Sequence, residues 1–397
     1  MWNPLNQKLT PRSKQVEKRE RSGNGALFFL LTEKMTLIID AHQDIAFNAL
    51  TFKRDIRLSA QEIRNQEKDT LVPYWNEGEA TVGWPDYQAG QIAVIFATLW
   101  NPPKPYCSGA WDVLSYQNVD QASRLAHQQF DYYHRLVEEN PEKFTLILRQ
   151  TDLQRVLAAW EEPDEGKAHP VGLMLHMEGA EGLRSINELE EFFELGVRQV
   201  GPVWAGIRYC GGSKEVRPFD REGFALLDTM ASLGLGMDIS HMSESAAMTA
   251  MDRFEGLVIA SHSNARTLLK GRSGERHLTD QVIRKLFDRG GCVGVVPYNK
   301  FLSTEWELNS PRDTVTISHI IDQIDYFCQE AGDSAHVGIG SDLDGGFGYP
   351  NIPMEIDTIK DMQKLAPALL ARGYSSEDVN NIFHLNWKNH LEKMLPK

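Results

Sequence analysis

The stretch "MTLIIDAHQDIAFNAL", residues 35–50, joins a buried strand directly to a group of ionisable side chains. The apolar run from Leu37 to Ile39 predicts a strand that is covered on both faces. It continues into Asp40, His42 and Asp44 within a few residues. Burying such groups without partners costs several kcal/mol each. The strand therefore ends either in solvent or at a site that uses these side chains.

Apolar, β-prone runs of the same kind recur along the chain and predict further strands. Besides residues 36–41, these runs are residues 92–100, 171–177, 197–203, 233–240, 257–261, 292–298 and 336–340, with 144–148 as a ninth candidate. Most of them are continuous rather than alternating, which is typical of parallel strands buried on both faces.

Amphipathic segments lie between these runs and predict helices. Asp220 and Thr279 are expected N-caps, and Gly196 and Gly256 mark expected helix ends. Alternation of strand and helix along most of the chain predicts a parallel sheet. About eight repeats favour a closed (β/α)₈ TIM barrel over an open doubly wound sheet. The Pro/Gly-rich segment 101–118 fits a long loop after a barrel strand.

The composition limits the classes of protein to consider. The chain has 397 residues, of which 42% are hydrophobic, and this is enough for one α/β barrel domain over residues 35–397. Residues 1–34 are expected to be a charged, poorly ordered extension. A net charge of −14 argues against a nucleic-acid partner. No run reaches the ~18 apolar residues that a membrane span requires. Four scattered cysteines without a C-x-x-C pair fit a reducing, cytoplasmic compartment.

Five of the predicted strands end in histidine or carboxylate side chains. These are His42 and Asp44, His176 and Glu178, His241, His262, and Asp342 with Asp344. In a barrel the carboxyl ends of the strands converge on one face. A lone histidine near a strand end is more often structural, but five such ends in one series predict a metal site. Histidine and carboxylate without cysteine is the ligand set of hydrolytic zinc, manganese or iron sites.

A calcium loop at "GIGSDLDGG" is excluded because Gly340 stands where an oxygen ligand is required.

The spacing of these residues suggests how they would divide between two ions. His42 and Asp44 are two residues apart on a strand, so both point to the same side and can hold one ion. Glu178 is a single carboxylate that can bridge two ions, and His241 and His262 can hold the second. Two ions ~3.5–4 Å apart can share a hydroxide and orient it for attack on a carbonyl carbon.

Asp342, which follows the last predicted strand, remains for proton transfer. It is expected to act as general base toward the attacking water and as general acid toward the leaving amine. These residues together predict a binuclear metallohydrolase.

Several motifs, in this order, resemble one known family. They are "DAHQD" (40–44), "HMEGAEGL" (176–183), "LGLGMDISHMSE" (233–244), "VIASHSNAR" (258–266), "ERHLTDQVIRKL" (275–286) and "HVGIGSDLDGG" (336–346). From about Ile38 to about Trp387 the chain resembles the membrane dipeptidase (renal dipeptidase) family of binuclear zinc metallopeptidases, which are amidohydrolase-type barrels. The resemblance implies two zinc ions on the ligand sets described above and a proton-transferring Asp342. It also implies that Arg276 binds the substrate carboxylate, for which a planar guanidinium is suited.

One position departs from the family pattern. After "LGVR" the family carries a histidine that polarises the substrate carbonyl, whereas this chain has Trp204 at or next to that place. A neutral indole N–H can donate one hydrogen bond but cannot carry charge. Trp204 is therefore expected to contact substrate, and Arg208 and Tyr209 are nearby candidates to replace the histidine. The alternative for these two residues is a salt bridge and a packed ring.

The resulting hypothesis is a metal-dependent dipeptidase that hydrolyses the amide bond of short, peptide-like substrates with a free carboxylate. The first alternative is an amidohydrolase acting on cyclic amides, lactams or N-acyl amino acids. The second is a barrel that binds ligands without catalysis. No membrane partner is expected, and a homodimer is compatible with the resemblance.

Overall fold

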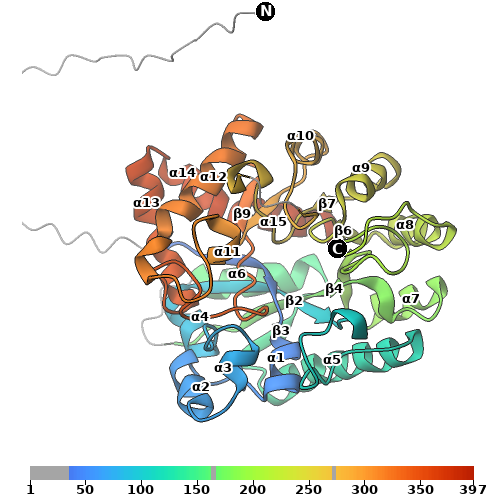
Figure 1. The fold of residues 1–397 in the computed structure, drawn as a ribbon, viewed down its shortest axis with the longest axis horizontal. Helices are drawn as coiled ribbons and strands as arrows, with labels where there is room; N and C mark the ends of the chain where they lie inside the picture. Colours follow the sequence, from blue (N-terminus) through green and yellow to red (C-terminus); the bar gives the residue numbers. More distant parts are fainter. Residues whose placement is uncertain (1–34, 162–166, 271–273) are drawn as a thin grey trace, which may run out of the picture. The chain divides into compact units, whose positions relative to one another are not determined.

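The computed structural model describes residues 35–161, 167–270 and 274–397, so the extension expected over residues 1–34 lies outside the described residues. Each of the nine stretches predicted to be strands contains one (Figure 1). Their bounds are β1 (Ile38–Gln43), β2 (Ile92–Trp100), β3 (Phe144–Leu146), β4 (Val171–Glu178), β5 (Val197–Gly201), β6 (Gly236–Asp238), β7 (Val258–Ile259), β8 (Val293–Val295) and β9 (Val337–Ile339).

Eight of these strands form a nearly closed parallel barrel, which confirms the predicted (β/α)₈ fold. They pair in the order β7-β6-β5-β4-β2-β1-β9-β8, and a parallel bridge between Ala260 and Val293 joins the two ends of this order. The ninth strand, β3, lies outside the ring. It pairs with residues 171–173 of β4, whereas β5 pairs with the following half of the same strand, residues 175–178.

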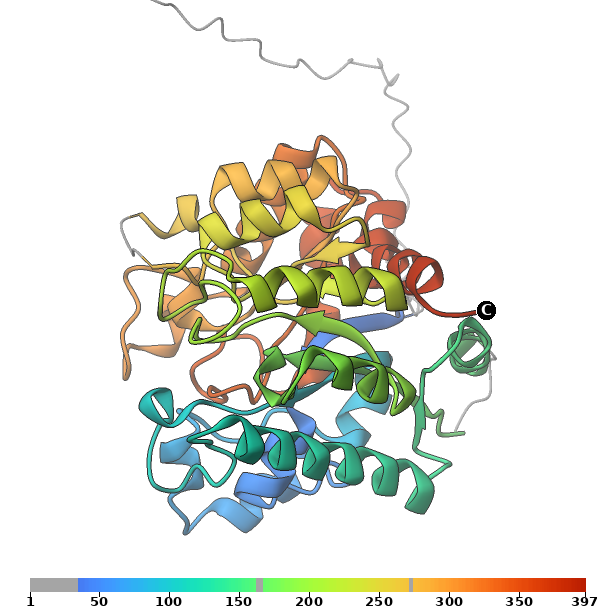
Figure 2. The ribbon, with the colours of Figure 1, turned by 90° about the vertical axis from the view of Figure 1, so that its right-hand side faces the viewer.

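Helices follow the strands and cover the barrel (Figures 1 and 2). Those between strands are α1 (Ile45–Phe52), α2 (Ala60–Glu67), α3 (Val72–Trp75), α4 (Trp84–Gly90), α5 (Val119–Glu139), α6 (Gln150–Glu161), α7 (Leu189–Glu194), α8 (Arg221–Leu233), α9 (Glu244–Arg253), α10 (Asp280–Asp288), α11 (Asn299–Leu302) and α12 (Ile317–Ala331). Three more follow β9, namely α13 (Leu365–Arg372), α14 (Ser376–Asn380) and α15 (Asn386–Met394).

The expected helix caps are present. The Asp220 carboxylate accepts a hydrogen bond from the backbone N–H of Gly223 at 2.8 Å, and α8 begins at Arg221. The Thr279 hydroxyl accepts from the backbone N–H of Val282 at 3.4 Å at the start of α10. Such bonds satisfy backbone donors that the first helical turn leaves free.

The strands are buried along nearly their whole length, as their continuous apolar sequences predict. One large hydrophobic cluster joins the strands to the surrounding helices. All four cysteines are free thiols, and only Cys107 is partly exposed. None of the helices in the described ranges is long and apolar enough to cross a membrane.

Gly294 and Gly340 allow neighbouring barrel segments to approach one another closely beside the predicted metal site. A Cβ atom on Gly294 or on Gly340 would overlap the carbonyl oxygen of Ser261. Only glycine fits such an approach of backbone to backbone. The loop that starts at Ser341 is thereby brought next to the end of β7.

Candidate metal centre

The barrel brings the predicted ligands together at the carboxyl ends of its strands. His42 lies near the end of β1, and Glu178 is the last residue of β4. His241, His262 and Asp342 each lie three residues beyond a strand end, after β6, β7 and β9. The side chains therefore come from five different strands, as is usual at the active face of such a barrel.

Glu178 lies at the centre of the group because its two oxygens face different partners. Its Oε2 is 3.3 Å from Nε2 of His42. Its Oε1 is 2.9 Å from Nε2 of His241 and 3.6 Å from Nε2 of His262. A carboxylate arranged in this way can give one oxygen to each of two ions.

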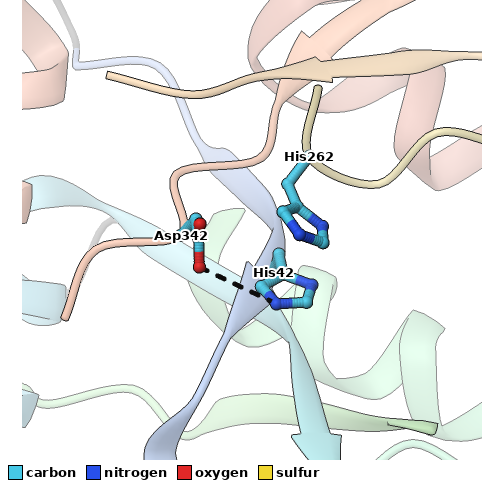
Figure 3. A group of neighbouring side chains, drawn as sticks. All are labelled: His42, His262 and Asp342. Carbon is cyan, nitrogen blue, oxygen red and sulfur yellow. Dashed lines mark ion pairs between the residues drawn. The ribbon is translucent and has the colours of Figure 1, made fainter. Parts of the chain in front are cut away.

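Asp44 and Asp342 add two further carboxylates to the group around His42. Nε2 of His42 is 3.9 Å from Asp44 Oδ1. It is 3.8 Å from Asp342 Oδ1, the contact drawn as a dashed line in Figure 3. The ring centroids of His42 and His262 are 3.6 Å apart, with the ring planes tilted by 31°. Three sets of buried side chains each place their ligand atoms within 4.8 Å of one another and could hold a metal ion. These sets are His42, Asp44 and Glu178; Glu178, His241 and His262; and His42, His262 and Asp342.

Burial and mutual repulsion govern the ionisation of these groups. Burial, followed by the charge of Glu178, raises the pKa of Asp44 to about 6. Burial also raises the pKa of Asp342 well above its usual value. Burial alone would lower the pKa of His42, but the neighbouring carboxylates, above all Glu178, raise it to about 10. The cluster is thus short of positive charge, which divalent cations would supply.

The donor set fits divalent metal ions of the zinc type. Nε2 of His42 is buried and has no hydrogen-bond partner in the described part of the chain, although it faces three carboxylates. Imidazole nitrogens and carboxylate oxygens without thiolates are the usual ligands of catalytic zinc.

Two serines fix the orientation of the histidine rings. The Ser261 hydroxyl donates to Asp238 Oδ2 at 2.6 Å, so its oxygen accepts from Nδ1 of His262 at 2.8 Å. The Ser213 hydroxyl donates to the carbonyl of His241 at 3.2 Å and lies 2.8 Å from Nδ1 of the same ring. In this arrangement both rings carry their proton on Nδ1, and the lone pair of Nε2 faces Glu178.

Asp238 is a buried residue whose role the sequence did not reveal. Its Oδ1 accepts from the backbone N–H groups of Ser240 and Ser261, at 3.0 and 2.9 Å. Its Oδ2 is 3.2 Å from Nε2 of His176, so His176 lies behind the ligands. Asp238 stands within the quoted motif "LGLGMDISHMSE", but its connection to His262, through the hydroxyls of Ser240 and Ser261, is visible only in the fold.

Asp40, the remaining acid of the opening stretch, holds the loop that carries Asp342. It accepts hydrogen bonds from the backbone N–H and the hydroxyl of Ser341, at 2.7 and 2.5 Å. Asp342 itself has φ of 53°, a left-handed conformation that is uncommon for a residue with a side chain. Its N–H donates to the carbonyl of His42 at 3.1 Å. Strain of this kind is typical of functional sites held by their surroundings.

The structure places both expected substrate-contacting residues on the wall of the same cavity. Its volume is about 930 Å³, and its lining includes Asp342, Trp204 and Arg276. Nη1 of Arg276 donates to the carbonyl of His262 at 3.0 Å. The ring centroid of Trp204 is 5.9 Å from that of His241.

Arg208 and Tyr209, the suggested replacements for the missing histidine, do not line this cavity. Nε of Arg208 is 3.2 Å from Oε2 of Glu222, and its guanidinium lies over the Tyr209 ring. Tyr209 is fully buried. The ion pair and the packed ring are therefore the correct interpretation. Lys214, which the sequence did not single out, does line the cavity, with Nζ 5.5 Å from the centre of the Trp204 ring.

A (β/α)₈ barrel with histidine and carboxylate side chains gathered at the carboxyl ends of its strands is the architecture of metal-dependent hydrolases. Within that class, residues 30–393 match the membrane dipeptidase family (peptidase family M19), and the chain belongs to this family. The resemblance seen in the sequence motifs is thereby confirmed.

Individual relatives are distant. The chain is 29% identical over 277 residues to an uncharacterized protein in the pqqA 5′ region of Klebsiella pneumoniae, covering 67% of this chain and 95% of that one. It is 26% identical to dipeptidase tcpJ of Claviceps purpurea, covering 66% of this chain but only 58% of that relative. Among solved structures, a metallopeptidase of Rhodobacter sphaeroides, liganded with a phosphinate mimic of the dipeptide L-Ala-D-Ala, has a TM-score of 0.72. That structure is 21% identical, covers 91% of this chain and is itself covered completely, which supports the fold.

Proposed function

We propose that this protein is a metal-dependent dipeptidase that hydrolyses the amide bond of short substrates with a free carboxylate. The observation that carries the proposal is the position of Glu178, whose two oxygens face His42 on one side and His241 with His262 on the other. Membership of the membrane dipeptidase family supports the same reaction.

We assign one ion to His42, Asp44 and Glu178 and a second to Glu178, His241 and His262. Two divalent cations, zinc in this proposal, would supply an activated water and positive charge at the developing oxyanion. The hydrogen bonds that the Ser213 and Ser261 oxygens accept from Nδ1 of His241 and His262 keep the Nε2 lone pairs available for this purpose.

Asp342 moves the proton in this mechanism. Its Oδ1 lies among the ligands, 3.8 Å from His42 Nε2, and its side chain lines the cavity. A carboxylate there can take the proton of the attacking water and return it to the leaving nitrogen. Burial raises the pKa of Asp342 well above its usual value, which brings its proton affinity closer to that required for both steps.

Arg276 binds the carboxylate of the substrate in this proposal. Its side chain lines the cavity beside Asp342, and one of its nitrogens is held by the carbonyl of His262. A guanidinium that is anchored at one nitrogen can offer the others to a carboxylate. The substrate is thereby fixed with its carboxylate at Arg276 and its amide at the metal ligands.

A substrate panel tests the proposal. Dipeptides with L and D residues at either position, N-acyl amino acids and cyclic amides are each offered with and without added zinc. Zinc-dependent hydrolysis of dipeptides is the expected result. Activity on N-acyl or cyclic amides with none on any dipeptide would refute it and favour the amidohydrolase alternative. Metal analysis of the replete protein is expected to give two ions per chain, whereas fewer than one would favour a non-catalytic barrel.

We also propose that the protein works in a reducing compartment, because its four cysteines are free and three of them are buried. Cell fractionation with thiol labelling tests this location, and disulfide-linked protein in the cell would contradict it.

A further inference from the structure

One wall of the cavity is made of aromatic side chains that touch one another in sequence. From the candidate ligand His241 outward, the ring centroids are separated by 5.9 Å to Trp204, 5.2 Å to Trp100, 4.7 Å to Phe47, 5.8 Å to Phe52, 5.2 Å to Trp111 and 5.6 Å to Trp75. All six line the cavity, and we call them the aromatic wall. An apolar surface therefore begins at the predicted ligand His241 and extends to the partly exposed rings of Trp111 and Trp75.

The aromatic wall is a built structure rather than a chance group of exposed rings. Its members come from α1, α3, the end of β2, the loop after β5, and the Pro/Gly-rich insertion 101–118, which carries Trp111. Behind them lies a hydrophobic cluster separate from the barrel core, to which Val72, Leu114 and Leu125 contribute. This packing holds the rings in place before any ligand arrives, so binding does not require them to be ordered first.

The position of the wall relative to Arg276 tells which part of a substrate it meets. Arg276 is held by backbone carbonyls at the ends of β6 and β7. Trp100 ends β2, which lies across the barrel from that pair in the order β7-β6-β5-β4-β2-β1-β9-β8. Glu178, at the end of β4, lies between them. A dipeptide with its carboxylate at Arg276 and its amide at Glu178 therefore extends its N-terminal residue toward Trp100.

We propose that the aromatic wall is a binding subsite for the side chain of the N-terminal residue, and that it selects aromatic and large aliphatic side chains. This inference rests on the proposed dipeptidase function. Large apolar side chains gain from leaving water, and rings gain further from edge-to-face contact with the wall. Small side chains such as that of glycine leave the wall uncovered. Lys214 lies at the Trp204 end of the wall, where its ammonium could pair with an acidic side chain of a substrate.

The test compares kcat/KM for Phe-Ala, Leu-Ala, Gly-Ala and the reversed Ala-Phe, each with L- and D-alanine. The native enzyme is expected to prefer Phe-Ala and Leu-Ala over Gly-Ala by roughly 10-fold or more. Trp111→Ala and Trp75→Ala should reduce this preference roughly 10-fold. Both positions are partly exposed, so the variants are expected to fold, and melting curves check this.

Val113→Ala is the matched control. Val113 lies two residues after Trp111, is 59% exposed and is not among the residues that line the cavity, so its truncation should leave the preference unchanged. Equal losses for Phe-Ala and Gly-Ala in the tryptophan variants would overturn the inference, as would a native preference for Gly-Ala.

A binding measurement separates this inference from the proposed function. Phe-Ala and Gly-Ala are titrated into the metal-replete native protein and the Trp111→Ala variant while tryptophan fluorescence is followed. If no dipeptide is hydrolysed, the dipeptidase proposal fails. Tighter binding of Phe-Ala that Trp111→Ala removes would still support an aromatic subsite, whereas equal binding of both dipeptides would overturn it.

Discussion

Ser261→Ala tests whether the hydrogen bonds behind the histidines prepare them for a metal ion. Ser261 is fully buried, and its hydroxyl connects Asp238 to Nδ1 of His262. Without this hydroxyl, the Nδ1–H of His262 loses its acceptor, and the ring is free to place its proton on Nε2 instead. A proton on Nε2 blocks the nitrogen that faces Glu178.

The size of the effect follows from these contacts. Removing a partner of this kind typically weakens metal binding 10–100-fold, which corresponds to roughly 1.4–2.8 kcal/mol. Because the serine oxygen lies 2.8 Å from Nδ1 of His262 but 3.5 Å from Nδ1 of His42, the binding of the second expected ion should be weakened more than that of the first. The unpaired N–H should also lower the free energy of unfolding by about 1–3 kcal/mol.

Competition with a chromogenic zinc chelator measures both equivalents of metal. Ser240→Ala is the matched control, because the Ser240 hydroxyl also donates to Asp238, at 2.6 Å, but its contact with His262 is to the backbone N–H rather than the ring. Native affinity for both equivalents in Ser261→Ala would refute the reasoning. So would an equal weakening in Ser240→Ala.

Three further predictions concern catalysis and stability. Asp342→Asn should keep both metals, measured by elemental analysis, but lose about 10²–10⁴-fold in kcat because no carboxylate remains to move the proton; near-native kcat would disprove the proton-transfer role. Arg276→Ala should raise KM roughly 10-fold or more for dipeptides with a free carboxylate, through loss of a charge-assisted hydrogen bond. An equal rise for the C-terminal amides would contradict carboxylate binding. Trp387→Ala should lower the free energy of unfolding, measured by urea denaturation, by about 3–5 kcal/mol. The ring is fully buried, and its N–H donates to the carbonyl of Ile339 at 3.0 Å. A loss below about 1 kcal/mol would show that the surrounding side chains repack.

The barrel could be predicted from the sequence because its signals are local. Each strand is a continuous apolar run, and the caps at Asp220 and Thr279 stand beside the helices that they begin. The exception is β3, whose apolar run is no different in kind from those of the barrel strands. Its place outside the ring depends on β4, which is long enough to pair with β3 along one half and with β5 along the other.

The metal cluster could be predicted because its histidines and carboxylates lie at, or within three residues of, the carboxyl ends of five strands. Their supporting residues have no such pattern. Ser213 contacts His241 from a loop 28 residues away, and Asp238 reaches His262 through the hydroxyls of Ser240 and Ser261. The aromatic wall was also missed, since single tryptophans in separate segments give no periodic signal until the fold brings them together.

The bonds from Asp40 to Ser341 also determine when the protein gains its site during synthesis. These residues are 301 positions apart, and β1 lies between β2 and β9 in the barrel. A growing chain therefore presents His42 and Glu178 long before Asp342 has been made. One edge of β1 therefore stays unpaired until β9 has been made and pairs with it. We expect a chain that stops before β9 to be unable to cleave peptides, so that the newly made protein becomes a hydrolase only after the loop that carries Asp342 has folded.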